Sequence, residues 1–255
     1  MYVDTHAHLY HKQFDGDRPE MVQRALDARV THLLLPNIDG ESIRAMHALV
    51  DAFPDVCRMM MGLHPCSVGQ DSIASLDQVE QLLGTGQYCA VGEIGIDLYW
   101  DKTWIEEQRE AFRTQVRWAK ELGLPIVIHC RNSFQEVITI VEDEKDERLR
   151  GVFHCFTGSV EEGKRVLAMD GFYLGIGGVL TFPKSGLAAT LAELGPDRCM
   201  LETDAPYLAP VPFRGKRNES SYIPHVAEGL AKATRRSVAD IAAITTTNAR
   251  DLFKL

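Results

Sequence analysis

Basic residues are in the minority in this 255-residue chain, where 27 Lys and Arg stand against 36 Asp and Glu and give a net charge of −9 at pH 7. The sequence therefore lacks the excess of positive charge with which many proteins bind nucleic acid. This excludes capture of a polyanion by bulk electrostatics. It leaves room for a local basic groove or for bound cations.

Paired cysteines and long apolar runs are also missing. The six cysteines stand singly at positions 57, 66, 89, 130, 155 and 199, and none forms a CxxC pair. A zinc-finger cage and a thioredoxin-type motif are thereby excluded. Most of these thiols lie in apolar runs, as expected of free cysteines in a reducing compartment. Because no secretory leader and no apolar stretch of 18 residues are present, we expect a cytoplasmic protein without a membrane segment.

Strand-like apolar runs alternate with helical patterns along the whole chain. The predicted strands are residues 2–6, 32–38, 57–65, 89–97, 125–131, 151–156, 172–178 and 198–205. The predicted helices between them include residues 19–29, 43–53, 76–83, 106–122 and 161–169. No linker rich in Pro, Gly or Ser divides the chain, so we expect one domain over residues 1–255.

This alternation favours parallel strands, because parallel pairing needs long connections. Eight such units in 255 residues predict a (β/α)8 barrel, or TIM barrel. The alternative is a doubly wound open sheet, which ordinarily carries a glycine-rich turn after its first strand, and residues 5–11 contain no such turn. Residues 222–233 and 237–253 predict two final helices, one more than the eighth unit needs.

Several residues mark where helices begin and end. Ser133 and Ser159 are each followed three residues later by a glutamate, Glu136 and Glu162, which is the capping-box pattern. Gly123, followed closely by a proline, is expected to end the helix over residues 106–122.

Side chains of the types that bind metal ions follow the strand-like runs. They are His6, His8, Glu93, His129, His154 and Asp204. The C-terminal ends of barrel strands converge on one face, where the active sites of this fold lie. Burying so many imidazoles and carboxylates without a cation would be costly. We therefore expect a metal site rather than a hydrogen-bonded polar core.

The number of these ligands predicts more than one ion. His6 and His8 are two residues apart and are expected to face the same way. Six ligands exceed what one tetrahedral ion needs, so we expect two divalent ions (Mg²⁺, Mn²⁺ or Zn²⁺) with Glu93 bridging them. Asp4 and Glu202 each precede a ligand by two residues and are expected to support ligands by hydrogen bonding. For Glu202 the alternative is a buried partner for an arginine.

Two features bear on the substrate. The loop over residues 212–217 carries Arg214, a lysine and Arg217 beside the end of the eighth strand, where they could contact phosphates or form a solvated turn. Tyr99, Trp100 and Trp104 follow the Glu93 strand and could stack on unpaired bases or pack over the barrel.

Seven segments together carry a resemblance to a known family. They are DTHAHL, GLHP, VGEIGIDLYW, PIVIHCR, FHCFTGS, LETDAPYLAP, and PFRGKRNES followed by YIPHVAE, and they run from residue 4 to about residue 228. The sequence resembles the TatD family of metal-dependent hydrolases, within the wider amidohydrolase-like barrels. The resemblance implies a TIM barrel, a divalent-metal centre and hydrolysis of phosphodiester bonds in DNA, often with 3′-exonuclease character.

Position by position, the resemblance implies metal ligands at the same six residues and a further active-site histidine, His64, that contacts substrate. The chain departs from the family at one point. The family usually has Pro after the Asn-Glu pair, whereas Ser220 and Ser221 follow Asn218 and Glu219 here. This departure puts substrate contacts of that turn in doubt and leaves the metal ligands unaffected.

Three functions remain open at this point. The first is a deoxyribonuclease acting on single strands or 3′ ends, in which a metal-activated water attacks and Glu93 and Asp204 are catalytic, Asp204 taking the proton of that water. The second is a metal-dependent hydrolase of a small amide, lactone or phosphoester. The third is a scaffold that binds nucleic acid or protein without catalysis, which the complete ligand set disfavours. No obligate protein partner is expected.

Overall fold

The computed structural model describes residues 1–70 and 72–255. The strands in these residues are β1 (Tyr2–Asp4), β2 (Val30–Leu35), β3 (Cys57–Met59), β4 (Val91–Asp97), β5 (Ile126–Arg131), β6 (Gly151–Phe153), β7 (Phe172–Ile176) and β8 (Cys199–Leu201). The helices are α1 (Arg18–Asp27), α2 (Gly40–Ala52), α3 (Ser72–Leu83), α4 (Ile105–Leu122), α5 (Phe134–Glu144), α6 (Val160–Leu167), α7 (Leu187–Leu194), α8 (Ile223–Thr234) and α9 (Val238–Phe253). Short 3-10 helices are η1 (Lys12–Phe14), η2 (Pro65–Ser67), η3 (Gly178–Thr181) and η4 (Ser220–Tyr222). None of the helices in this part of the chain is long and apolar enough to cross a membrane.

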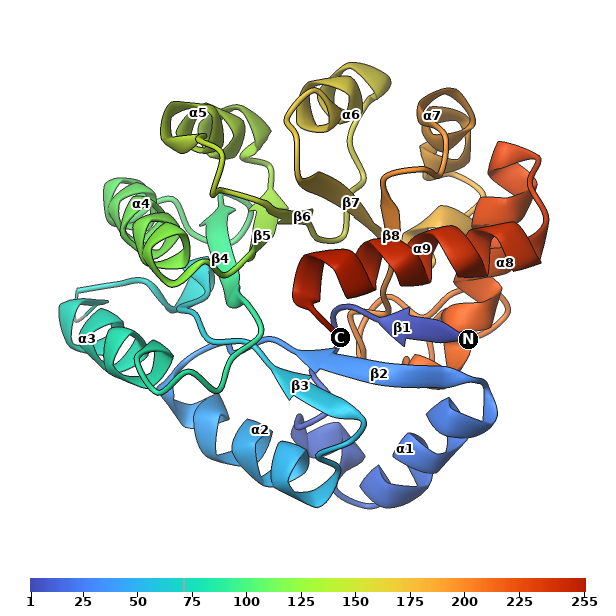
Figure 1. Ribbon diagram of the computed structural model, residues 1–255, viewed down its shortest axis with the longest axis horizontal. Helices are drawn as coiled ribbons and strands as arrows, with labels where there is room; N and C mark the ends of the chain where they lie inside the picture. The colour runs from blue at the N-terminus through green and yellow to red at the C-terminus, as the bar shows by residue number, and fades with distance from the viewer. Residues whose placement is uncertain (71) are drawn as a thin grey trace.

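The strands form a closed parallel barrel. Hydrogen bonds order them as β1-β2-β3 and as β4-β5-β6-β7-β8. Two parallel bridges join these groups, one between Met61 and Val91 and one between Ala7 and Ala205. The helices surround the strands (Figure 1). The predicted (β/α)8 barrel is therefore confirmed, and the open doubly wound sheet is excluded.

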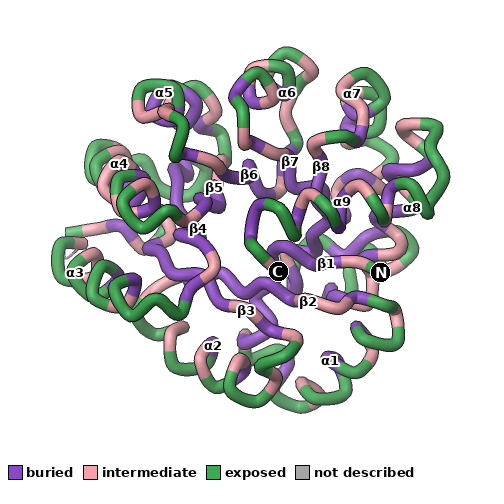
Figure 2. Tube along the Cα trace, viewed as in Figure 1, coloured by how far each residue is buried: buried purple, intermediate pink, exposed green. Residues whose placement is uncertain are grey.

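The outer helices pack through faces that the sequence spacing predicts. In α4 the buried positions include Ala111, Phe112, Val116 and Ala119, which recur at three- and four-residue intervals on one side of the helix. Gly123 ends this helix in the left-handed conformation, with φ of 66°, as the sequence predicts. Figure 2 shows the result as buried strands inside a ring of helices with exposed outer faces.

The two predicted capping boxes have different outcomes. Ser159 accepts a hydrogen bond from the backbone N–H of Glu162, whose side chain accepts one in return, so this box is confirmed. Ser133 occupies the N-cap position of α5 but makes no capping hydrogen bond. Its hydroxyl donates instead to the carbonyl of Ile96. The predicted N-cap position of Ser133 is confirmed, but its predicted capping box is wrong, because a buried carbonyl of the neighbouring strand accepts the hydroxyl.

The additional C-terminal helix, α9, closes one end of the barrel. Leu252 and Phe253 belong to a buried cluster with interior residues of the strands, among them Val3, Leu34 and Val127. Figure 1 shows α9 lying beside β1 and β8, close to both chain termini. Thr246 and Asn248 of α9 donate to the carbonyls of Met1 and Asp197, just before β1 and β8. α9 therefore covers the N-terminal ends of these strands and leaves the C-terminal ends to the polar residues described below.

β4 and β5 end where the sequence predicts, at Asp97 and Arg131, whereas the other strands end earlier. β3 ends at Met59 rather than at residue 65, and β8 ends at Leu201 rather than at residue 205. Past these ends the chain leaves the ladder and turns polar side chains toward the barrel axis. Cys155 and Asp204 adopt left-handed conformations, with φ of 47° and 57°, which no strand can continue.

Gly95 allows β4 to approach β5 at the level of these polar residues. It pairs with His129 across the two strands and has φ of 144°. A Cβ atom at this position would lie 2.0 Å from the carbonyl oxygen of His129. Glycine is therefore required here for both its conformation and its size.

We expect Gly95→Ala to lower the free energy of unfolding by about 2–5 kcal/mol, because it adds backbone strain and a steric clash. Denaturant titration followed by circular dichroism measures the change. Gly16→Ala is the matched control, since a Cβ there would meet nothing within 4 Å, and we expect a change below about 0.5 kcal/mol. Equal stability of the two variants would contradict the role given to Gly95.

Candidate metal centre

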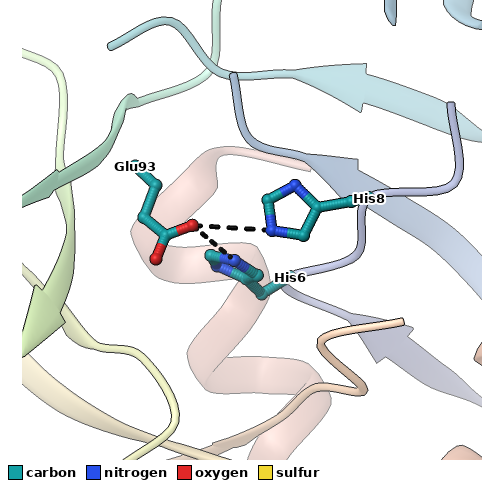
Figure 3. A group of neighbouring side chains, drawn as sticks. All are labelled: His6, His8 and Glu93. Carbon is teal, nitrogen blue, oxygen red and sulfur yellow. Dashed lines mark ion pairs between the residues drawn. The ribbon is translucent and has the colours of Figure 1, made fainter. Parts of the chain in front are cut away.

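The other five residues predicted as ligands gather around the carboxylate of Glu93. Its Oε2 atom lies 3.1 Å from Nε2 of His6 and 3.5 Å from Nε2 of His8 (Figure 3). The Oδ1 atom of Asp204 lies 3.8 Å and 3.6 Å from the same two nitrogens. His6 and His8 follow β1, Glu93 lies within β4, and Asp204 follows β8. The closed barrel thus brings together residues almost 200 positions apart in the chain.

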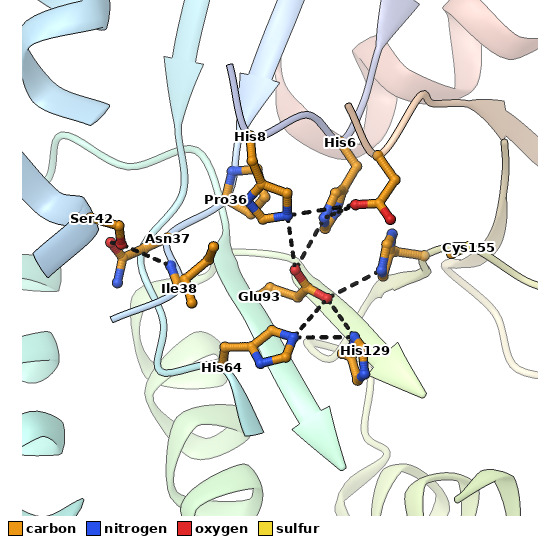
Figure 4. A network of polar contacts seen from close by, with 12 residues as sticks. His6, His8, Pro36, Asn37, Ile38, Ser42, His64, Glu93, His129 and Cys155 are labelled. Carbon is orange, nitrogen blue, oxygen red and sulfur yellow. Dashed lines mark hydrogen bonds and ion pairs between the residues drawn. The ribbon is translucent and has the colours of Figure 1, made fainter. Parts of the chain in front are cut away.

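The other oxygen of Glu93 faces a second group of imidazoles. Oε1 lies 2.7 Å from Nδ1 of His129, 3.1 Å from Nε2 of His154 and 3.4 Å from Nε2 of His64 (Figure 4). Two carboxylate oxygens that face two separate sets of ligand atoms have the arrangement of a bridging group.

The chemistry of this donor set fits divalent cations. His6 is completely buried, and neither of its ring nitrogens has a hydrogen-bond partner among the described residues. A buried polar atom without a partner costs free energy, so such atoms are rare in folded proteins. A cation bound between His6, His8 and Glu93, whose ligand atoms all lie within 4.8 Å of one another, would give Nε2 of His6 a partner.

Hydrogen bonds on the far side of the ring orient His8, His129 and His154. Nδ1 of His8 lies 2.9 Å from the hydroxyl of Tyr10, and that hydroxyl donates to the carbonyl of Pro36 at 2.6 Å. Nδ1 of His8 must then be the donor to Tyr10. In the neutral ring this leaves the lone pair on Nε2, the nitrogen that faces Glu93 and Asp204.

Glu202 supports His154 in the same way. One of its oxygens lies 3.2 Å from Nδ1 of His154 and accepts a hydrogen bond from the backbone N–H of Cys155 at 2.6 Å. Gly175 makes room for this carboxylate, since a Cβ there would lie 2.2 Å from the other oxygen of Glu202. The structure thus places Glu202 against a predicted ligand and not against an arginine.

Asp4 lies in a different place from the one expected. Its carboxylate accepts hydrogen bonds from the backbone N–H of Thr203 at 3.0 Å, the hydroxyl of Thr203 at 2.7 Å and the hydroxyl of Ser220 at 2.6 Å. It contacts the backbone of His6 at 3.4 Å rather than the ring. Asp4 therefore holds together the ends of β1 and β8 and the turn at η4. Ser220, at the position where a proline was expected, supplies one of these bonds.

Asp97 has a role that the sequence reasoning missed. One of its oxygens lies 2.8 Å from Nε2 of His129, which leaves Nδ1 of that ring for Glu93. The other oxygen accepts hydrogen bonds from the backbone N–H groups of Tyr99 at 2.8 Å and Trp100 at 3.2 Å. The available signal was the alternation along β4, in which Asp97 lies four residues after Glu93 and so shares its face.

Two buried glutamines of α4 also position the site and carried no signal in the sequence. Gln108 accepts the backbone N–H of Asp97 at 2.9 Å, and Gln115 accepts that of Leu63 at 2.7 Å. Leu63 precedes His64, whose Nε2 lies 3.3 Å from Nδ1 of His129. The structure thus places His64 beside the predicted ligands.

The two arginines expected at the substrate lie elsewhere. Arg217 forms a two-pronged salt bridge to Asp17 at 2.6 Å and 2.7 Å and donates to the carbonyl of Gln13 at 2.8 Å. Arg214 is exposed, with its guanidinium 4.4 Å from the ring centre of Phe182. Neither residue lines the cleft above Glu93. These contacts fix Arg217 beside the start of α1, and the carboxylate of Asp17 neutralises its charge.

A cleft of about 640 Å³ opens above the cluster. Its floor includes His8, Glu93 and His129, and its rim includes Trp100 and Tyr207. The site is therefore reachable by a substrate, although most of its ligands are buried.

Burial and neighbouring charges shift the pKa values of these residues in opposite directions. Burial would raise the pKa of Glu93, but the imidazoles of His154 and His64 outweigh it and hold that pKa well below its usual range. Burial would lower the pKa of His154, but the carboxylates of Glu93 and Glu202 raise it well above its usual value. Burial raises the pKa of Asp204 to about 6, against the opposing effect of His154.

A family model, curated relatives and solved structures all relate this chain to the same family. Residues 3–254 match the family model described as TatD related DNase. An uncharacterized metal-dependent hydrolase, YabD, of Bacillus subtilis is 38% identical over 100% of both chains. The 3′-5′ ssDNA/RNA exonuclease TatD of Edwardsiella piscicida is 34% identical over 99% of both. The crystal structure of YJJV, a TatD homolog from Escherichia coli K12, has a TM-score of 0.93 at 30% identity and covers 100% of this chain and 98% of that one.

We expect Asp97→Asn to weaken divalent-metal binding by about 10- to 100-fold, because the amide no longer fixes the ring of His129 as a carboxylate does. Titration of the metal-free protein with Mn²⁺ or Zn²⁺ measures the affinity. Asp101→Asn is the matched control, since Asp101 is exposed and accepts the N–H of Thr103, away from the predicted ligands. Metal affinity unchanged by Asp97→Asn would disprove the orienting role.

Metal binding is expected to release protons near neutral pH. In the metal-free protein the raised pKa of His154 keeps its imidazole protonated near neutral pH. Asp204, with a pKa of about 6, gains a proton as the pH falls toward and below that value. A cation can bind these groups only after their protons leave, so affinity should fall as the pH drops. Calorimetric titration in two buffers of different ionisation enthalpy should show release of about one proton or more per chain at a pH of about 6.5. A binding enthalpy that is independent of the buffer would contradict this.

Proposed function

The chain belongs to the TatD-related DNase family, and from this premise we propose that it is a divalent-metal-dependent hydrolase of phosphodiester bonds in DNA. The observation that carries the proposal is the position of Glu93. Its two oxygens face two groups of ligand nitrogens on the floor of an open cleft. A carboxylate in this position suits a site that clamps a phosphoryl group between two cations.

We assign the ligands to two ions. His6, His8 and Asp204 would hold the first together with Oε2 of Glu93, in keeping with separations of 3.1–3.8 Å. His129 and His154 would hold the second together with Oε1 of Glu93, in keeping with separations of 2.7 Å and 3.1 Å. The mixture of imidazole and carboxylate is compatible with Mg²⁺, Mn²⁺ and Zn²⁺.

Divalent cations in such a site lower the pKa of water and neutralise charge on phosphoryl oxygens. The protein supplies the proton acceptor. Asp204 stands at the edge of the cleft, and its pKa of about 6 makes it a carboxylate at neutral pH that remains basic enough to take a proton. The left-handed backbone at Asp204 directs this carboxylate at His6 and His8 rather than along the strand.

His64 would contact the phosphoryl group directly. It lies beside Glu93 and His129 and lines the cleft, and its buried position lowers its pKa, so that it acts as a neutral hydrogen-bonding group. We do not extend this role to Arg217, because Asp17 occupies its guanidinium.

The proposed substrate is single-stranded DNA attacked from its 3′ end. The name of the Edwardsiella relative, a 3′-5′ ssDNA/RNA exonuclease, supports both the strand state and the polarity. We further propose that residues 1–255 form one domain, which works in the cytoplasm without an obligate protein partner, as expected from the sequence.

A small-molecule substrate is the second candidate. A cleft of about 640 Å³ falls within the range of about 300–1,000 Å³ that is typical of small-ligand sites. Such an enzyme would use the same metal ligands on a compact amide, lactone or phosphoester.

We expect the protein, stripped with chelator and supplied with Mg²⁺, Mn²⁺ or Zn²⁺ in turn, to shorten end-labelled single-stranded DNA from the 3′ end. Glu93→Gln should lower the rate by about 100-fold or more, since the amide cannot bridge two cations. Gel analysis of 5′-labelled oligonucleotide gives both rate and polarity. Glu228→Gln is the matched control, because Glu228 lies at the surface of α8 and is 63% exposed, and it should leave the rate unchanged.

The same preparations are assayed on a generic small phosphodiester. Metal-dependent hydrolysis of the small diester without shortening of DNA would replace the proposed function with the second candidate. Full activity of Glu93→Gln on DNA in metal-limited buffer would show that the catalytic site lies elsewhere.

A further inference from the structure

Two adjacent aromatic residues stand exposed at the rim of the cleft. Tyr99 is 53% and Trp100 70% exposed. Their rings lie edge to face with centres 4.9 Å apart. Trp104, by contrast, is partly buried at the start of α4. Rings that packed over the end of the barrel would be buried by neighbouring side chains. Tyr99 and Trp100 are exposed, so packing does not explain why aromatic residues stand at these positions.

Arg131 adds an unneutralised positive charge to the same rim. It ends β5 and pairs with Asp97 across the strands. Its guanidinium lies 3.9 Å from the ring centre of Tyr99 and 5.3 Å from that of Trp100. Within the described residues no carboxylate forms a salt bridge with Arg131, whereas Arg217 is paired with Asp17. Tyr99 thus holds the guanidinium in place while its charge stays available to a ligand.

The rim is fixed to the proposed metal ligands through one side chain. Asp97 accepts the backbone N–H groups of Tyr99 and Trp100 with one oxygen and contacts His129 with the other. Trp100 and Arg131 also line the cleft that reaches Glu93 and His129. A ligand bound at the rim would therefore be held at a set distance from the reacting centre.

We propose that Trp100 and Arg131, supported by Tyr99, form a subsite for one unpaired nucleotide of the substrate. The base stacks on the exposed face of Trp100, and Arg131 binds the neighbouring phosphate. This inference rests on the proposed function and adds to it the reason for a single-stranded substrate. Bases in a duplex have both faces covered by neighbouring bases, so only an unpaired base can stack on the indole.

The first test uses Trp100→Ala and Trp100→Phe with a fluorescently labelled single-stranded oligonucleotide. Trp100→Ala should weaken binding by about 5- to 100-fold, the range of one base–aromatic stack. Trp100→Phe should stay within about threefold of the wild type, since a phenyl ring also stacks. The matched control is Ile73→Ala on α3, because Ile73 is an equally exposed apolar residue (76%) and should have no effect.

Oligonucleotides with one abasic nucleotide, moved in turn through the last few positions at the 3′ end, identify the partner of Trp100. At one position the missing base should weaken binding to the wild type and leave binding to Trp100→Ala unchanged. Equal losses for both proteins at every position would overturn the stacking. Arg131→Gln should lower the slope of log affinity against log salt concentration by about 0.7, the value for one phosphate contact on a single strand. An unchanged slope would overturn the phosphate contact.

Measurements in chelator separate this inference from the proposed function. The wild-type indole fluorescence should be quenched by the oligonucleotide, and the quenching should disappear in Trp100→Phe. If DNA is not cleaved with any metal and the quenching persists, the subsite stands and the nuclease function falls. If DNA is cleaved and Trp100→Ala binds and cleaves like the wild type, the subsite falls and the nuclease function stands.

Discussion

One buried carboxylate, that of Glu93, sets the arrangement of the proposed active site. An isolated carboxylate in the barrel interior would be strongly disfavoured, because burial removes its hydration. Here the imidazoles of His6, His64, His129 and His154 approach its two oxygens and hold its pKa well below the usual range. The same contacts leave His6 without hydrogen bonds within the described residues. The carboxylate and the imidazoles therefore attract one another, but the nitrogens of His6 still lack partners in the described part of the chain. This is expected of a site that is stabilised when cations bind.

The barrel makes this cluster possible by allowing close approach at particular points. Gly95 lets β4 pass against the carbonyl of His129, and Gly175 leaves space for the carboxylate of Glu202. The opposite end of the barrel is closed by the apolar face of α9, which includes Leu252 and Phe253. Apolar packing at one end thus stabilises a fold whose other end carries buried polar groups at a cost in stability.

The sequence predicts the parts of this structure that depend on local pattern. The strands follow from apolar runs, and the ligands follow from the histidines and acids that stand in or just after these runs. Contacts between distant residues were not predictable in this way. The sequence around Arg217 does not reveal that Asp17 neutralises its charge, because Asp17 lies 200 residues earlier. Asp4 and Ser220 are likewise joined across 216 positions, and the partner of Ser133 is a carbonyl of the neighbouring strand.

Asp97 shows why such contacts matter for function. Its carboxylate orients His129 at the centre and holds the backbone that carries Tyr99 and Trp100. A pKa of about 2 keeps it ionised, because hydrogen bonds from His129 and from the backbone outweigh the effect of burial. Binding at the rim and positioning at the centre therefore depend on the same group. In a chain with a net charge of −9, positive charge at this site would come from bound cations and from Arg131. Attraction of a polyanion is then confined to the cleft, where the phosphate that is to be cleaved would lie.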